Sequence, residues 1–273
     1  MKWYKVWVAS TRYQKPEALT YASELELKNG NVVVIPLASK QVLGFIDRET
    51  AKPKFATKQI AKALDDVFLP KQSQELFAWL MEYYPAGSGA TLQLFLPTSL
   101  ITKKTVKTVA TAKTKPKKPF KLPALTKQQK SALETIKGSN KHRFLLHGDT
   151  GSGKTRIYIE RSTETIKAGK SVLILTPEIA LTPQLAEDFS AQFDNQVIII
   201  HSNLTPKARR EYWLRIATSK EPLVVIGPRS ALFSPLKNLG LIVVDEFHEP
   251  AYKQEQSPRY HSLRVAGALA KIQ

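Results

Sequence analysis

A glycine-rich segment in the second half of the chain has the residue types and spacing of a phosphate-binding loop. It fits the pattern G-x-x-x-x-G-K-[ST] at every fixed position and reads Gly148-Asp149-Thr150-Gly151-Ser152-Gly153-Lys154-Thr155. Glycines let the backbone wrap closely around a phosphate with its N–H groups turned inward. In such loops the lysine contacts the β- and γ-phosphates of ATP, and the hydroxyl binds Mg²⁺. We therefore expect all eight residues to bind ATP, with Thr155 as a Mg²⁺ ligand.

A loop of this kind needs a strand before it and a helix after it. The apolar residues Phe144–Leu146 predict the strand, and residues 154–168 have the length of a helix. The N-terminus of that helix would add its dipole to the phosphate site.

Two adjacent carboxylates, Asp245 and Glu246, follow the apolar run Leu241–Val244. A strand that ends in such a pair delivers both to the carboxyl edge of a parallel sheet, where ligands usually bind. We expect Asp245 to hold Mg²⁺ through water, and Glu246 to orient and polarise the water that attacks ATP. His248 completes D-E-F-H, which resembles the D-E-x-H box of superfamily 2 helicases. There the histidine lies between nucleotide and nucleic-acid contacts, so Lys154, Glu246 and His248 are the expected catalytic residues.

The hydrophobic pattern indicates which elements position these residues. Short apolar runs alternate with segments of helical length; the runs are Val172–Leu175, Val197–Ile200, Leu223–Ile226 and Leu241–Val244. Continuous apolar strands alternating with helices are typical of a parallel sheet covered on both faces. The fold class is therefore α/β, and the helicase box implies a RecA-like helicase lobe over residues 122–273.

The first hundred residues have a different pattern. Apolar residues alternate from Tyr4 to Val8, and the runs Val32–Leu37 and Val42–Ile46 predict further strands. A helix is expected over Ser73–Tyr84, with Leu76, Leu80 and Tyr83 on one face. Residues 1–101 are thus expected to form a small β-rich domain with a helical tail.

A basic segment, residues 102–121, separates the two parts. It contains eight lysines, two prolines and no acidic residue. Like charges repel and prolines block regular structure, so the segment is expected to be an extended linker. It would act either as a strap along DNA or as a spacer that touches nothing.

Composition narrows the class of protein further. Lys and Arg number 41 against 23 Asp and Glu, a net charge of +18 that favours polyanionic partners such as DNA. The chain has no cysteine, which excludes disulfides, thiolate zinc sites and cysteine nucleophiles. No apolar run approaches the ~18 residues of a membrane span, and the N-terminus lacks the uncharged core of a signal peptide. A cytoplasmic protein without membrane contact is expected.

Several segments resemble the primosomal protein N-prime family of replication-restart helicases. They are Leu173–Gln184, His201-Ser202, Ile226–Phe233, Tyr252-Lys253-Gln254 and Arg259-Tyr260-His261. The resemblance implies a 3′→5′ DNA helicase that acts at stalled forks, with residues 1–101 capturing a DNA 3′ end. It also implies that DNA crosses Pro177–Gln184 and Gly227–Ser230, and that Gln129 contacts adenine. The implied partners are forked and single-stranded DNA, primosome proteins and single-strand-binding protein.

The chain departs from that family at three positions. Phe247 and Arg156 stand where the family has glutamate, and Pro228 stands where it has threonine, which removes a hydroxyl and an N–H from an expected DNA contact. No second lobe, arginine finger or cysteine-rich zinc region follows the box before Gln273. We therefore expect an incomplete helicase that binds ATP and forked DNA, hydrolyses ATP weakly and does not unwind DNA. Two other interpretations stay open: a non-catalytic DNA-binding half-helicase that recruits partners, and an unrelated P-loop enzyme such as a small-molecule kinase.

Overall fold

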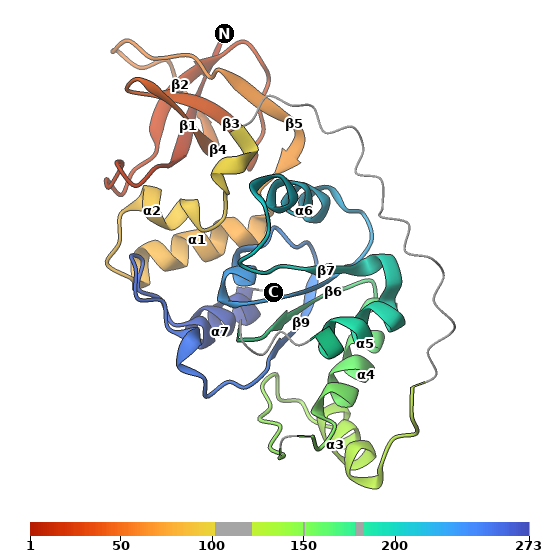
Figure 1. Cartoon of the computed structure of the whole chain (residues 1–273). Coiled ribbons are helices and arrows are strands. Elements are labelled where there is room, and N and C mark those ends of the chain that lie inside the picture. Colours follow the sequence, from red (N-terminus) through yellow and green to blue (C-terminus); the bar gives the residue numbers. More distant parts are fainter. Residues whose placement is uncertain (102–121, 150, 178–182, 273) are drawn as a thin grey trace.

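The computed structural model describes residues 1–101, 122–149, 151–177 and 183–272. Two β-sheets organise the chain: an antiparallel sheet near the N-terminus and a parallel sheet in the remainder (Figure 1). The basic segment 102–121, expected to be a linker, lies outside the described residues. Within the described ranges, no helix is long and apolar enough to cross a membrane.

The N-terminal sheet has five strands in the order β2-β1-β4-β3-β5, and every pairing is antiparallel. The strands are β1 (Lys2–Ala9), β2 (Leu19–Ser23), β3 (Asn31–Leu37), β4 (Lys40–Thr50) and β5 (Lys62–Phe68). Tyr4, Val6 and Val8 are fully buried on one face, as their alternation predicted. The expected strands at Val32–Leu37 and Val42–Ile46 are confirmed within β3 and β4, whereas the sequence pattern predicts neither β2 nor β5.

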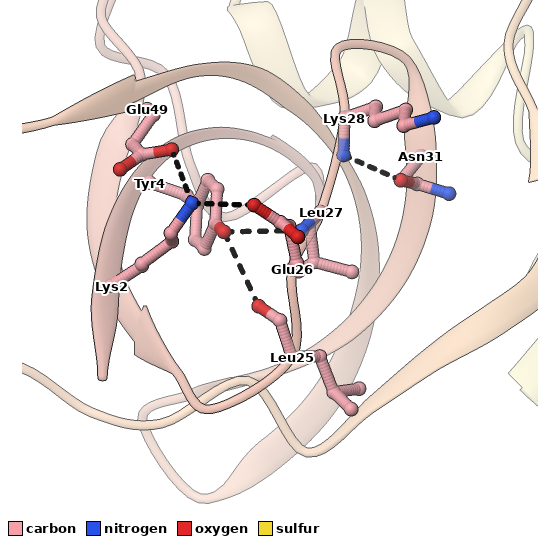
Figure 2. Close-up of polar contacts among 8 residues, drawn as sticks. All are labelled: Lys2, Tyr4, Leu25, Glu26, Leu27, Lys28, Asn31 and Glu49. Carbon is pink, nitrogen blue, oxygen red and sulfur yellow. Dashed lines mark hydrogen bonds and ion pairs between the residues drawn. The ribbon is translucent and has the colours of Figure 1, made fainter.

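Polar contacts fasten the segment between β2 and β3 to the beginning of β1 (Figure 2). The Tyr4 hydroxyl donates to the Leu25 carbonyl at 3.2 Å and accepts from the Leu27 N–H at 3.1 Å. The Lys2 ammonium contacts the carboxylates of Glu26 at 2.8 Å and Glu49 at 3.3 Å.

Three helical segments follow this sheet: α1 (Lys71–Tyr83), α2 (Ser88–Gln93) and the 3-10 helix η1 (Thr98–Ile101). The predicted helix is confirmed as α1, with Leu76 and Leu80 buried. Tyr83, the third residue expected on that face, is 52% exposed. Phe77 is buried between Leu76 and Leu80 instead, so the apolar stripe of α1 ends one turn before Tyr83.

The second sheet is parallel, in the order β7-β8-β6-β9, which confirms the α/β class. Its strands are β6 (Ser171–Leu175), β7 (Val197–Ile199), β8 (Val224–Gly227) and β9 (Leu239–Val244). One face packs against α4 (Lys154–Lys167) and α5 (Pro183–Phe193), and the other against α6 (Pro206–Thr218) and α7 (Ser262–Ile272). α3 (Lys127–Lys137) contacts α4, and the short 3-10 helices are η3 (Asp194–Gln196), η4 (Arg229–Phe233) and η5 (Pro250–Tyr252).

The strand expected at Phe144–Leu146 is wrong. These residues lie in a loop, with Phe144 44% and Leu145 71% exposed. β9 pairs with β6, and no strand of the described ranges pairs along its other edge. Apolar residues form a strand only where a neighbour supplies backbone hydrogen bonds and a packed face, and this segment has neither.

One hydrophobic core joins the two sheets. Phe77 and Phe95 from the N-terminal part belong to the same buried cluster as Trp213, Phe233 and Tyr260. The rings of Phe95 and Phe233 meet edge to face at 5.1 Å, and those of Phe233 and Tyr260 do the same at 5.1 Å. The Trp213 indole also donates a buried hydrogen bond to the Phe95 carbonyl at 2.8 Å. These contacts hold the N-terminal sheet in place beside the parallel sheet.

Candidate functional site

The glycine-rich loop leads directly into α4, as predicted. Gly151 and Gly153 both have a φ angle of 80°. Positive φ angles of this size are strongly disfavoured for residues other than glycine. Gly153 caps the N-terminus of α4, and Lys154 and Thr155 lie in its first turn. A Cβ atom at Gly153 would come within 2.5 Å of the Gln129 amide nitrogen, so a larger residue there would displace that side chain. Residue 150 lies outside the described part of the chain.

Lys154 folds back over the loop it follows. Its ammonium donates to the carbonyls of Gly148 at 2.8 Å and Asp149 at 3.3 Å, and the Ser152 N–H donates to the Asp149 carbonyl at 3.1 Å. The same ammonium lies 3.9 Å from the Glu246 carboxylate. The fold therefore brings the P-loop lysine and the second box carboxylate together across a long stretch of sequence.

Gln129 connects the start of α3 to the P-loop. Its side-chain oxygen accepts from the Thr126 N–H at 3.0 Å, while Thr126 accepts from the Gln129 N–H in a capping box. Its amide nitrogen donates to the Gly153 carbonyl at 3.2 Å. Both ends of this buried amide are thus bonded to protein, which gives Gln129 a role in holding the loop. Its predicted contact with adenine stays a prediction.

Asp245 follows β9 and is held by two tyrosines. The Tyr158 hydroxyl donates to its Oδ1 at 3.0 Å, and the Tyr252 hydroxyl lies 2.5 Å from its carbonyl oxygen. The Asp245 N–H donates to the Leu175 carbonyl at 2.9 Å, which extends the pairing of β9 with β6. The sequence reasoning gave Tyr158 no role. Its position four residues after Lys154 could have indicated one, because residues i and i+4 share a face of a helix.

Burial sets the protonation of these groups. It raises the pKa of Asp245 above its ordinary value, and the neighbouring Glu246 charge adds to this, while the Tyr158 hydrogen bond and Lys154 oppose it. Burial beside the carboxylates also raises the pKa of Tyr158 and of Tyr252. Both hydroxyls therefore remain protonated hydrogen-bond donors at neutral pH.

Glu246 has an unusual backbone conformation. Its φ is 45°, in the left-handed region that residues other than glycine seldom occupy. Such strain is often found at functional sites. The turn it makes is closed by a hydrogen bond from the Glu249 N–H to the Glu246 carbonyl at 2.9 Å. His248 is well exposed, and its Nε2 lies 3.8 Å from Glu246 and 3.9 Å from Glu249.

The donor atoms suit Mg²⁺ shared with a nucleotide. Mg²⁺ prefers oxygen ligands, keeps several waters and usually binds through one or two carboxylates plus phosphates. The Asp245 carboxylate and the Thr155 hydroxyl are donors of this kind. Residues in the described ranges contain no group of three or more His, Cys, Asp or Glu placed to hold a metal by themselves. The residues thus fit a phosphate-bound Mg²⁺ better than a dedicated protein site.

Of the two segments expected to cross DNA, one can be located. Gly227–Ser230 joins the end of β8 to η4, whereas residues 178–182 lie outside the described part. The Arg229 guanidinium donates to the carbonyls of Ala251 at 2.7 Å and Lys253 at 3.0 Å. It therefore ties this segment to the chain that follows the D-E-F-H box. Pro228 caps η4, and its carbonyl accepts from the Ala231 N–H at 2.8 Å.

Two of the departures from the helicase pattern have visible surroundings. Arg156 pairs with Glu160 on α4 and donates to the Pro123 carbonyl at 3.3 Å, so it fastens the segment before α3 to the P-loop helix. Phe247 is 48% exposed, and its ring lies edge-on to that of His248 at 6.1 Å.

Comparison with known families gives two matches. The model described as DEAD/DEAH box helicase matches residues 126–268, just over half of the 273-residue chain. The model described as 3'DNA-binding domain (3'BD), from PriA, matches residues 5–97. The two matches fall on the parallel sheet and the antiparallel sheet respectively.

The chain is also similar to proteins named Replication restart protein PriA. It is 39% identical to that of Helicobacter pylori over 249 residues, which is 91% of this chain and 38% of the relative. It is 36% identical to that of Rickettsia felis over 256 residues, 93% of this chain and 38% of the relative. With that of Bacillus subtilis the identity is 46% over 146 residues, 52% of this chain and 18% of the relative. The chain therefore spans well under half the length of these relatives.

Proposed function

The chain belongs to the DEAD/DEAH box helicase family, and from this premise we propose that it forms the N-terminal part of an ATP-dependent DNA helicase for replication restart. The restart function is suggested by the name of its relatives, and the DNA substrate by the 3'DNA-binding domain match. We assign residues 1–101 to binding a DNA 3′ end, residues 102–121 to a basic linker and residues 122–273 to the ATP-binding lobe.

The proposal rests on the proximity of the P-loop, residues 148–155, to the D-E-F-H box. The Lys154 ammonium lies 3.9 Å from the Glu246 carboxylate, and the adjacent Asp245 accepts a hydrogen bond from the P-loop helix. An ammonium, two carboxylates and glycine N–H groups at one edge of a parallel sheet suit phosphoryl transfer to water.

Each residue has a proposed task in that reaction. Backbone N–H groups of residues 148–155 and the Lys154 ammonium bind the phosphates and neutralise their charge. Thr155 and Asp245 hold Mg²⁺, which supplies further charge neutralisation when bound. Glu246 orients the attacking water and accepts its proton, which requires Lys154 to move from the carboxylate to the phosphate. His248 links the nucleotide site to the segment proposed to contact DNA. Gln129 holds the P-loop in position through its hydrogen bond to the Gly153 carbonyl.

Translocation from 3′ to 5′ and Mg²⁺ dependence are part of the same proposal. So are forked and single-stranded DNA, primosome proteins and single-strand-binding protein as partners. The net charge of +18 supports DNA binding, because lysine and arginine release counterions from phosphates.

The test measures ATP turnover by the purified chain with and without single-stranded DNA, together with forked-DNA binding by fluorescence anisotropy. We expect DNA binding and turnover that rises with DNA. Glu246→Gln should keep ATP binding and lower turnover by about 10²-fold or more. DNA binding without any turnover would favour the non-catalytic module, and binding of neither ATP nor DNA would refute the proposal.

A further inference from the structure

At one end of the N-terminal sheet, cations lie beside the Trp3 ring, on the face that further along packs against Phe77 of α1 through Trp7. Tyr4 and Val6 of β1 point into the core, so Trp3 and Lys5 point to the opposite face. Arg48 of β4 lies directly opposite Lys5 and is 70% exposed. Like charges placed opposite each other in a sheet destabilise it. Asp47 pairs with Arg48 and offsets part of this repulsion, and a bound anion would offset the rest.

The loop that joins β4 to β5 follows from this end of the sheet (Figure 1). Residues 51–61 contain Lys52, Lys54 and Lys58 but no acidic residue. The Lys52 ammonium lies 5.7 Å from the centre of the Trp3 ring, a cation–π distance that places the loop beside β1. Phe55 is 64% exposed near the middle of the loop.

The ends of this loop are fixed while its middle is exposed. The Ala22 N–H donates to the Lys58 carbonyl at 3.0 Å, and the Lys58 ammonium donates to the Ala38 carbonyl at 3.2 Å. Phe55 is therefore displayed on a loop anchored to the sheet on the side of β5 and held against Trp3 on the side of β4.

The nearby acidic residues leave most of these cations unneutralised. Glu26 and Glu49 both contact Lys2, at 2.8 and 3.3 Å, and Asp47 pairs with Arg48 (Figure 2 shows the first two). Within the part of the chain that the structure describes, Lys5, Lys52 and Lys54 form no salt bridge. The unpaired lysines thus give this surface a positive electrostatic potential that would attract several phosphates.

We propose that Trp3, Lys5, Arg48, Lys52, Lys54 and Phe55, the basic aromatic surface, bind a single DNA strand. Lysines and Arg48 contact its phosphates, and Phe55 stacks on an unpaired base. A cation cluster alone would suit any anion, but an exposed aromatic side chain such as Phe55 among cations is typical of surfaces that bind single strands regardless of sequence. This surface rests on the proposed DNA function and adds a contact for the strand beside the residues that bind its end.

The experiment measures binding of a fluorescent oligothymidine to the whole chain over a range of salt concentrations. Lys52→Ala combined with Lys54→Ala should reduce the log–log salt slope by about 1.4, from roughly 0.7 for each lost phosphate contact. Phe55→Ala should weaken binding about 5- to 150-fold at constant slope, the range for one lost base stack. The substituted side chains are exposed, and Lys52→Ala loses only a surface cation–π contact of about 0.5–1 kcal/mol, so the melting temperature should fall by no more than about 4 °C.

Lys127→Ala combined with Lys130→Ala is the matched control. It removes the same charge from exposed positions of α3, at the opposite end of the molecule (Figure 1), and should leave the slope near that of the wild type. An unchanged slope in the Lys52 and Lys54 variant, with wild-type binding intact, would refute this surface alone. A changed slope without an effect of Phe55→Ala would overturn the single-strand assignment. A wild-type chain that binds no DNA would instead refute the proposed function.

Discussion

Replacing Tyr158 with phenylalanine tests whether the P-loop helix holds Asp245. The substitution removes only the hydroxyl that donates to Oδ1 at 3.0 Å and leaves the ring packed on the parallel sheet. Hydrogen bonds to charged groups contribute about 1.5–3 kcal/mol, and the half-buried position favours the lower limit. We expect a loss of about 1.5 kcal/mol in the free energy of unfolding, or roughly 3–6 °C in melting temperature.

The same variant should show a characteristic pH dependence. Because burial raises the pKa of Asp245, its charge destabilises the fold above that pKa, and the penalty disappears as pH falls through it. The Tyr158 hydrogen bond offsets part of that penalty. The difference between Tyr158→Phe and wild type should therefore be largest at neutral pH and shrink as the pH is lowered. Urea unfolding between pH 4 and 8 measures it, with Tyr83→Phe as a control at an exposed tyrosine. An equal difference at every pH would refute the assignment of the effect to the Asp245 carboxylate.

Three further outcomes follow from the contacts described. Trp213→Phe should destabilise the fold by about 1–3 kcal/mol in urea, because it leaves the buried Phe95 carbonyl without its donor; no change would mean that the two sheets are held by packing alone. Glu246→Gly should be about 1 kcal/mol more stable than Glu246→Ala, because glycine adopts the φ of 45° without strain, and both should lose ATP turnover. Lys2 lowers the pKa of Glu26, so the Glu26 carboxylate stabilises the fold above the ordinary glutamate pKa, and this stabilisation is lost as the pH falls through the lowered pKa. Glu26→Gln should therefore flatten the decline of melting temperature below about pH 4. An unchanged decline would contradict the ion pair.

The sequence predicted the parts of the site that depend on local spacing. The segment 148–155 specifies a backbone conformation through its glycines, and Asp245-Glu246 needs only an apolar strand before it. Both are found where the pattern places them, and the strands at Val172–Leu175 and Leu241–Val244 are confirmed within β6 and β9. Because nearly every side chain of these two strands is apolar, a short apolar run predicts each strand without knowledge of its partners.

The pattern failed where a neighbour decides the outcome. Phe144–Leu146 is as apolar as the runs that form strands, but it pairs with none in the described ranges and is exposed. The hydrogen bond from Tyr158 to the Asp245 carboxylate joins residues far apart in sequence, and no local spacing predicts which hydroxyl reaches which carboxylate. The sequence did not predict the shared core that contains Phe95 and Trp213 for the same reason, since the apolar faces of the two halves do not indicate that they pack against each other.

The central claim is that the loop at residues 148–155 binds ATP through Lys154. Calorimetric titration of the chain with ATP and Mg²⁺ tests it most directly, with Lys154→Ala as the variant and Lys167→Ala as a control at the exposed far end of the same helix. We predict saturable binding to wild type and Lys167→Ala, loss of binding in Lys154→Ala and equal melting temperatures for all three. Equal ATP affinity in Lys154→Ala and wild type would contradict the assignment of the site.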